Sequence, residues 1–219
     1  MALIKLLAIR HGQTQYNIDR KIQGDAEGIG LTELGEHQAR DAAKNLCALE
    51  LDFSRFICSP LERAIKTFDI MSSDLFGPEL ALKIKSRLEI ESRLRERSFG
   101  DLHHKTLDEL MTLIEKSGLS EIEYRPQNGE NLPDLLERTS AWLMEQHQYA
   151  KTLSTSENWL LVTHGGVLSA LEAFTNKLQF KSSINGGRFK NGGINIFELG
   201  GEEIRLVSSE RMDADSQHV

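Results

Sequence analysis

Apolar segments of strand length alternate with amphipathic helical segments along most of this 219-residue chain. Residues 3–9 and 159–163 are apolar runs too short for a typical helix, and each runs into a glycine-containing turn. Later segments repeat apolar residues at spacings of three and four, which is typical of a helix with one buried face. This alternation predicts an α/β fold: a mostly parallel sheet covered by helices on both faces, forming a three-layer α/β/α sandwich.

The predicted elements follow from local patterns. Strands are expected at 3–9, 56–58, 159–163, 194–199 and 204–207, and helices at 32–49, 59–71, 106–116, 132–153 and 167–174. Thr32 is expected to cap the first of these helices, and Ser59-Pro60-Leu61-Glu62 has capping-box spacing for the second. The last two strands predict a hairpin around Gly200-Gly201. We expect one domain, 1–219, with a flexible polar tail at 211–219.

Composition excludes some classes of function. The chain has 26 Lys and Arg against 33 Asp and Glu, and the resulting charge of −7 argues against nucleic acid as a partner. No apolar stretch approaches the length of a membrane span, and no signal peptide is recognisable, so we expect a cytoplasmic protein without a membrane partner. Cys47 and Cys58 are expected to be buried free thiols. The oligomeric state, monomer or dimer, stays open.

Two predicted strands end in similar polar motifs, Arg10-His11-Gly12 and Thr163-His164-Gly165-Gly166. Because the carboxyl ends of parallel strands meet at one edge of a sheet, the two histidines can converge there. A third strand ends at Ser59, and the helix after it carries Arg63 in its first turn. Phosphoryl transfer needs a nucleophile and donors around the phosphoryl oxygens, which a neutral imidazole, arginine forks and glycine N–H groups can supply.

Five motifs resemble those of the histidine phosphatase (phosphoglycerate mutase-like) superfamily, and they occur in the order found in that family. In this sequence the motifs are Arg10-His11-Gly12-Gln13-Thr14-Gln15-Tyr16-Asn17, Arg63-Ala64-Ile65-Lys66-Thr67, Leu94-Arg95-Glu96 followed by Phe99-Gly100, Gly129-Glu130, and Thr163-His164-Gly165-Gly166. The resemblance implies a phosphoglycerate mutase-like fold and catalysis through a phosphohistidine.

The resemblance also assigns roles to individual residues. His11 would be the nucleophile, and Glu96 would protonate the leaving oxygen and then activate water, with Glu89 and Glu91 as alternative acids. A further set would hold the phosphoryl oxygens or orient the nucleophile: Arg10, Arg63, His164, Gly165, Asn17 and Gln23. Asn17 and Gln23 could instead cap a turn. The substrate would be a small phosphate ester, and no metal or other cofactor is expected.

Within the superfamily, the resemblance favours a phosphatase. Mutases of this type carry a longer insert before the Gly-Glu turn and paired arginines, and this chain has a short segment there and no Arg-Arg pair. The segments 92–97 and 21–25 resemble TIGAR-type fructose-bisphosphatases, which implies a sugar phosphate or bisphosphate such as fructose 2,6-bisphosphate. A phosphoglycerate mutase and a phosphate-binding module without turnover are the alternatives.

One segment departs from the family pattern. The family usually reads G-x-x-E-G after the acid, whereas this chain reads Gly100-Asp101-Leu102-His103-His104. His103 or His104 could touch substrate, or both could be exposed loop residues. The glycine-rich segment 186–193 could cradle phosphate, but it lacks P-loop spacing, and a turn before a strand is the favoured interpretation. His37, His147 and His218 are predicted to lie on the surface.

Overall fold

A computed structural model of the chain describes residues 2–176 and 189–212, and in that part six strands form one mixed sheet in the order β3-β2-β4-β1-β5-β6. The strands are β1 (Ile4–Arg10), β2 (Arg55–Cys58), β3 (Glu89–Ile90), β4 (Glu157–Thr163), β5 (Ile194–Leu199) and β6 (Arg205–Ser209). The first four are parallel, and β5 and β6 add an antiparallel hairpin at one edge. The predicted α/β class and the hairpin are confirmed.

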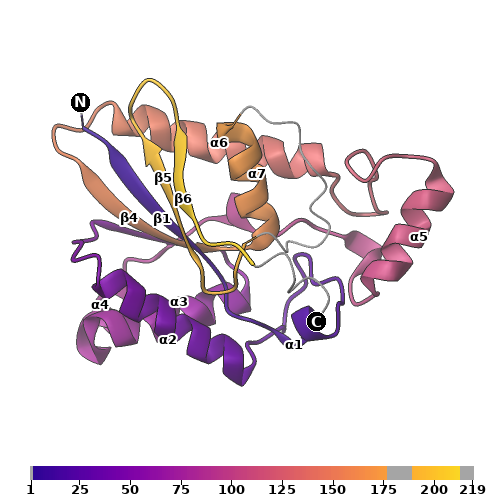
Figure 1. The fold of residues 1–219 in the computed structure, drawn as a ribbon, viewed down its shortest axis with the longest axis horizontal. Coiled ribbons are helices and arrows are strands. Elements are labelled where there is room, and N and C mark those ends of the chain that lie inside the picture. The colour runs from indigo at the N-terminus through magenta and orange to yellow at the C-terminus, as the bar shows by residue number, and fades with distance from the viewer. Residues whose placement is uncertain (1, 177–188, 213–219) are drawn as a thin grey trace.

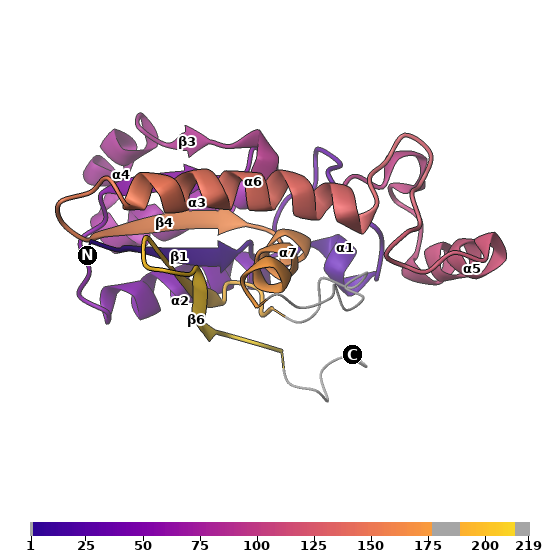
Figure 2. The ribbon, with the colours of Figure 1, turned by 90° about the horizontal axis from the view of Figure 1, so that it is seen from above.

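Helices cover both faces of this sheet (Figure 1). The helices of the described residues are α1 (Gln15–Ile18), α2 (Glu33–Cys47), α3 (Glu62–Phe76), α4 (Pro78–Lys85), α5 (Leu107–Ser117), α6 (Leu132–Ala150) and α7 (Gly165–Thr175). Helices α6 and α7 pack on one face, and α2 and α3 pack on the other. Figure 2 shows β1 and β4 pointing toward the end of the molecule where α1 and α5 lie.

Alternate side chains of the central strands enter two separate cores. Leu6 and Ala8 of β1 join the core beneath α6 and α7, whereas Leu7 and Ile9 join the core beneath α2 and α3. All four side chains are completely buried. Burial on both faces explains why β1 reads as a continuous apolar run rather than an alternating one.

Three boundaries differ from the sequence predictions. Helix α3 begins at Glu62 with Leu61 as its N-cap residue, so the capping box predicted at Ser59 is wrong; the Ser59 hydroxyl bonds a histidine instead. Helix α2 ends at Cys47, which leaves Leu49 exposed rather than on its buried face. Helix α6 ends at Ala150 rather than residue 153. The elements α1, α4 and β3 were not predicted. Elements of two to four residues, such as β3 and α1, are too short to show a periodic pattern, and α4 is only about two turns long.

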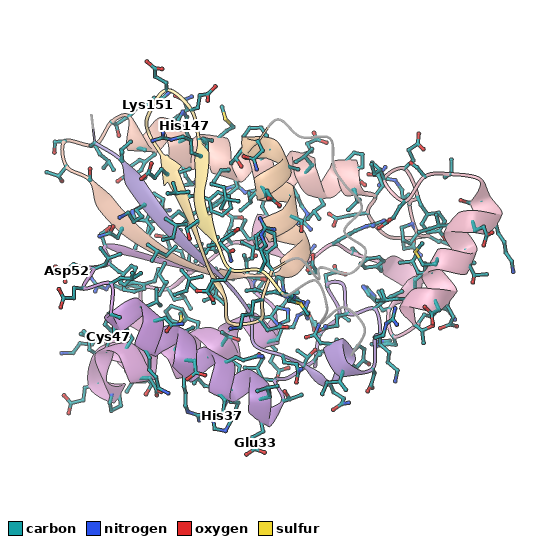
Figure 3. The ribbon with its side chains drawn as sticks, in the orientation of Figure 1. Glu33, His37, Cys47, Asp52, His147 and Lys151 are labelled. Atoms are coloured by element: carbon teal, nitrogen blue, oxygen red, sulfur yellow. The ribbon has the colours of Figure 1, made fainter. Side chains whose placement is uncertain are left out.

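Two predictions of exposure were also wrong. His147 is buried on α6 because its Nδ1 accepts a hydrogen bond from the Gly200 amide, 3.0 Å away, which ties the helix to the β5–β6 turn (Figure 3). Cys47 is exposed, whereas Cys58 is buried as predicted, and both thiols are free. His37 is exposed as expected, and His218 and most of the predicted tail lie outside the described residues. None of the described helices is both long enough and apolar enough to cross a bilayer.

Candidate active site

The parallel register of β1 and β4 brings the two histidine motifs together. Arg10 pairs with Thr163 at the last position of the ladder, and the His11 amide donates to the Thr163 carbonyl at 2.9 Å. His11 and His164 therefore leave the same sheet edge side by side, with ring centroids 5.1 Å apart. Both side chains are buried. The convergence predicted from the strand ends is present in the structure.

The His11 imidazole is held in one tautomer. Its Nδ1 lies 2.7 Å from the Gly12 carbonyl, to which it donates, and this leaves Nε2 with its lone pair. Burial lowers the pKa of His11 well below its ordinary value, and the charges of Arg63 and Arg10 lower it further. The Gly12 amide in turn donates to the Thr67 hydroxyl at 3.0 Å. A buried, neutral imidazole with a free nitrogen is a competent nucleophile at neutral pH.

Two buried guanidinium groups flank these histidines. Arg10 donates through one terminal nitrogen to the Phe189 carbonyl at 2.6 Å. Arg63 donates to the carbonyls of Gly24 at 2.6 Å and Ala26 at 3.3 Å. The Nε atom of each arginine is buried and has no hydrogen-bond partner among the described residues. Burial lowers the pKa of each guanidinium to about 10, so both stay charged near neutral pH and keep donors to spare for an anion.

His164 is oriented by Ser59, the residue that follows β2. The His164 Nε2 lies 2.6 Å from the Ser59 Oγ, whereas its Nδ1 is buried without a partner in the described part of the chain. If the Ser59 hydroxyl donates to Nε2, the neutral imidazole carries its proton on Nδ1 and can donate there. Burial lowers the pKa of His164 well below its ordinary value, and the charge of Arg63 adds to this effect. The neutral form is therefore favoured.

Glu96 is a carboxylate whose charge acts on both of the buried arginines. Its Oε2 accepts from the Gly166 amide and its Oε1 accepts from the Arg97 amide, both at 2.9 Å. A Cβ atom on Gly166 would lie 2.1 Å from Oε1, so glycine is required at that position for the carboxylate to sit there. The Glu96 charge also raises the pKa of both Arg10 and Arg63 against the effect of burial, which places the three groups in one electrostatic cluster.

The two alternative acids are engaged elsewhere. Glu89 forms a bidentate ion pair with Arg55, and Glu91 pairs with Arg93 and caps the turn that follows β3. Neither carboxylate contacts the histidine cluster through any of these bonds. The arrangement therefore favours Glu96 as the acid over Glu89 and Glu91.

The acid segment is anchored by Arg138 of α6, which sequence reasoning missed. Its guanidinium donates to the carbonyls of Arg93, Arg95 and Glu96 at 2.5, 2.8 and 3.1 Å. The same guanidinium pairs with Glu130 of the Gly-Glu turn at 2.8 Å. This network explains how a turn distant in sequence from Glu96 fixes the backbone that presents it.

Asn17 and Gln23 meet at Thr14. The Thr14 hydroxyl lies 3.1 Å from the Asn17 Oδ1 and 2.9 Å from the Gln23 Oε1, and Asn17 completes a capping box on α1. The sequence left open whether Asn17 and Gln23 contact phosphate or cap a turn, and in the structure Asn17 does take part in a cap. Gly165 opens α7 directly after His164, where the first amides of the helix have no intrahelical acceptor.

The described part of the glycine-rich segment packs against the first histidine motif. The Asn191 side chain donates to the His11 carbonyl at 2.8 Å, and the Gly192 amide donates to the Arg10 carbonyl at 2.9 Å. Residues 186–188 lie outside the described residues. These contacts make residues 190–193 a turn that supports β1 and then leads into β5.

Several polar residues of this cluster were not selected from the sequence: Thr14, Ser59, Thr67, Arg138 and Asn191. Ser59 could have been selected, because it directly follows a strand at the same edge as His11 and His164. Thr14 and Thr67 lie within the quoted motifs, whereas Arg138 and Asn191 contact the cluster through tertiary packing, which leaves no local signal. Across residues 2–176 and 189–212, no three His, Cys, Asp or Glu side chains gather closely enough to hold a metal ion.

Comparisons with known proteins agree with this geometry. A sequence model of the histidine phosphatase superfamily (branch 1) matches residues 6–211. The chain is 30% identical over 164 residues to the fructose-2,6-bisphosphatase TIGAR B of Danio rerio, an alignment that covers 72% of this chain and 61% of that protein. It is 31% identical over 173 residues to a Photorhabdus laumondii protein named "Probable phosphoglycerate mutase GpmB", covering 77% of this chain and 73% of the relative.

Solved structures match nearly the whole chain. Bacillus stearothermophilus YhfR superposes with a TM-score of 0.75 at 25% identity, covering 96% of this chain and 98% of that one. The alpha-ribazole phosphatase of Shigella flexneri superposes with a TM-score of 0.74 at 26% identity, covering 95% of this chain and 96% of that one. Together with the paired histidine motifs at one sheet edge, these matches show that the chain belongs to the histidine phosphatase superfamily.

Proposed function

We propose that this protein is a metal-independent phosphatase that hydrolyses a small phosphorylated metabolite through a phosphohistidine on His11. The observation that carries the proposal is the state of His11: a buried imidazole whose Nδ1 is bonded to the Gly12 carbonyl, leaving Nε2 free beside two guanidinium groups. A binding module would need the anion donors, but it would gain nothing from a nucleophile prepared in this way.

In the first step, the His11 Nε2 attacks phosphorus in line with the ester oxygen. An N–P bond forms, the P–O bond to the leaving group breaks, and Glu96 in its acid form gives a proton to the departing oxygen. The charge on the phosphoryl oxygens is met by Arg10, Arg63 and the Nδ1–H of His164. The products are phosphohistidine and an alcohol.

In the second step, water attacks the phosphorus from the side that the alcohol has left. Glu96, now a carboxylate, takes a proton from this water, the N–P bond breaks, and inorganic phosphate is released. His11 returns to its neutral form and Glu96 to its acid form. Gly165, Asn17 and Gln23 would contribute contacts to the phosphoryl group or hold the loop that faces it.

For the substrate, we favour a sugar phosphate or bisphosphate such as fructose 2,6-bisphosphate. The acid segment 92–97 and the segment 21–25 support this choice, as does the similarity to a zebrafish fructose-2,6-bisphosphatase. A mutase is the second candidate, because a relative named for that activity is similarly close in sequence. The short segment between Glu96 and Glu130 and the lack of an Arg-Arg pair favour hydrolysis.

A panel assay tests the proposal. Purified protein in the presence of a chelator would be incubated with p-nitrophenyl phosphate, fructose bisphosphates and phosphoglycerates, and both phosphate release and isomerisation would be measured. We expect phosphate release from at least one ester, with His11→Asn as the inactive control. Isomerisation of phosphoglycerate that outpaces hydrolysis would favour the mutase, and the absence of turnover with every ester would contradict both.

A further inference from the structure

Residues 16–26, here called the phosphate loop, begin within α1 and supply contacts that shape the anion site. It carries Gln23, and the backbone carbonyls of Gly24 and Ala26 on this loop accept the hydrogen bonds that hold the Arg63 guanidinium. Because Arg63 has no carboxylate partner in these bonds, its direction depends on where the loop places these two carbonyls. Whatever fixes the loop therefore fixes Arg63.

The segment that departs from the family pattern packs directly on this loop. The Ile22 amide donates to the Lys105 carbonyl at 2.8 Å, and the His104 amide donates back to the Ile22 carbonyl at 3.0 Å. Apolar side chains close the same contact, since Ile22 is buried with Phe99 and with Leu110 of α5. The two histidines of this segment thus lie against the phosphate loop, with His103 partly buried and His104 exposed, as the alternative interpretation of this segment expected for a loop residue.

His103 contacts the far end of the loop. Its Nε2 lies 2.9 Å from the Asp25 Oδ1, an ion-pair distance, and 3.3 Å from the Phe99 amide nitrogen. The Asp25 Oδ1 is buried and has no hydrogen bond of regular geometry among the described residues, so the contact is an ion pair, and it requires a proton on Nε2. Asp25 lies between the two residues whose carbonyls hold Arg63. A Cβ atom on Gly24 would lie 2.8 Å from the same Nε2, so the approach of the ring depends on glycine at that position.

The charge at Asp25 agrees with this contact. Burial alone would raise its pKa, but the interactions with His103 and Ser98 and the charge of Arg95 outweigh burial and lower the pKa to about 2. Asp25 is therefore ionised throughout the neutral range. An ionised carboxylate that is mostly shielded from water holds an N–H donor more strongly than an exposed one does.

His104 contacts the start of the loop. Its Nδ1 lies 2.8 Å from the Tyr16 hydroxyl, and the two rings meet edge to face with centroids 5.7 Å apart. The backbone of His104 has a φ of +71°, a conformation that favours glycine over a residue with a side chain. A residue other than glycine is therefore unfavourable for the backbone at this position. The interaction that the His104 side chain makes in return is its contact with Tyr16.

We propose that His103 and His104 are positioning residues that clamp the two ends of the phosphate loop, through Asp25 and Tyr16, and thereby aim Arg63 at the phosphoryl group. The inference rests on the proposed function, because the group that Arg63 would meet is the phosphoryl group on its way to His11. His103 acts through Asp25 and the Gly24 and Ala26 carbonyls, and touches no reacting atom. His104 acts on the start of the loop, at Tyr16 of α1.

The test compares variants in two backgrounds, wild type and Arg63→Lys. The measurements are kcat/KM for p-nitrophenyl phosphate and the Kd for inorganic phosphate, with Tm as the check on folding. His103→Ala removes the donor, and His103→Gln restores an N–H that can reach Asp25. His104→Gly removes the imidazole while suiting the backbone conformation. His37→Ala is the matched control, an exposed histidine on α2 (Figure 3).

In the wild-type background, His103→Ala should weaken phosphate binding and lower kcat/KM by about tenfold, as expected when a group that contacts the transition state is displaced. His103→Gln should recover activity to within about threefold, and His104→Gly should lose about threefold. In the Arg63→Lys background, the loss of kcat/KM from His103→Ala should shrink to less than about twofold, because the guanidinium group that His103 helps to position is absent.

Two results would overturn the clamp. One is an equal loss from His103→Ala in both backgrounds, and the other is a His103→Gln variant no better than His103→Ala. A variant that lowers Tm but leaves the phosphate Kd unchanged would show a purely structural role and would also overturn it. Failure of the proposed function would give a different result. Wild-type protein that binds phosphate but hydrolyses no ester would contradict the proposed function, and the Kd values of the variants for phosphate would still show whether His103 and His104 position Arg63.

Discussion

The floor and the rim of the candidate site are built by different means. The floor consists of four buried residues, Arg10, His11, Arg63 and His164. Three of them, Arg10, His11 and His164, lie at the ends of β1 and β4, where the register of the sheet fixes their positions. The rim consists of the phosphate loop, residues 98–107 and α5, which are held by a few backbone hydrogen bonds and by side-chain contacts between loops.

This difference separates the parts of the site that can vary. Register in a parallel sheet cannot shift without moving the buried side chains of two cores, so the floor chemistry is constrained along with the fold. The rim can change one side-chain contact at a time, as the His103-His104 segment shows. We therefore expect the floor to determine the reaction and the rim to determine which phosphate ester is accepted.

The largest effect should come from Glu96→Gln, which leaves the floor intact and removes the proton donor. We expect kcat/KM, which reports the phosphorylation step, to fall by about 10²- to 10³-fold with an alkyl phosphate, whose leaving oxygen needs a proton, and by much less with p-nitrophenyl phosphate, whose leaving group does not. Steady-state kinetics with the two esters measure this. Glu89→Gln, in the ion pair with Arg55, is the matched control and should stay within about twofold of wild type.

A second effect should come from Ser59→Ala. Without the hydroxyl, His164 is no longer held with its proton on Nδ1, so we expect kcat/KM to fall by about 10- to 100-fold while Tm changes little. Ser73→Ala, on α3 and away from His164, is the control. If Ser59→Ala kept at least half of the wild-type kcat/KM, the assigned tautomer of His164 would be wrong.

The pH profile should show a smaller but diagnostic change. Burial and the two arginines lower the pKa of His11 below the ordinary histidine value of 6.5. The imidazole therefore remains neutral as the pH falls past that value, and the acid limb of the kcat/KM profile should lie at a lower pH. Arg63→Met removes a positive charge that disfavours the imidazolium, so the pKa of His11 should rise and the acid limb should move to higher pH. A limb that moved to lower pH would contradict the electrostatic coupling between Arg63 and His11.

The smallest effect on the chemistry should come from the apolar side chains of the rim. Leu110→Ala leaves a cavity beneath α5, and we expect kcat/KM for p-nitrophenyl phosphate to change by less than about threefold, while KM for a sugar bisphosphate rises. Leu161→Ala, in the core beneath α6 and α7, should instead destabilise the whole protein by about 2–5 kcal/mol. Equal losses of stability in the two variants would remove the distinction between floor and rim.

The floor could be predicted from the sequence because its signals are local and ordered. A buried strand followed by Arg10-His11, and another followed by His164, place both histidines at one edge of a parallel sheet without any knowledge of side-chain contacts. Ser59 was misjudged for a physical reason: a Ser-Pro pair before a helix has the same pattern whether the hydroxyl caps the helix or bonds a histidine.

The rim could not be predicted in the same way. His103 and Asp25 are far apart in the sequence, and their contact depends on the fold of two loops that have no periodic pattern. His147 illustrates the same limit in the core, because a histidine on a helix looks like a surface residue until its acceptor role toward the Gly200 amide is known. The roles of the individual site residues therefore stay predictions that the variants must test.

The central claim is that His11 carries the phosphoryl group, and trapping that intermediate tests it most directly. A ³²P-labelled ester that the protein turns over would be mixed with it and quenched in base within milliseconds, and the labelled residue would be located by mass spectrometry. We predict an acid-labile, base-stable phosphoryl group on His11, absent in His11→Asn, that appears before inorganic phosphate accumulates. Turnover by His11→Asn at the wild-type rate, or label on any other residue, would contradict the account.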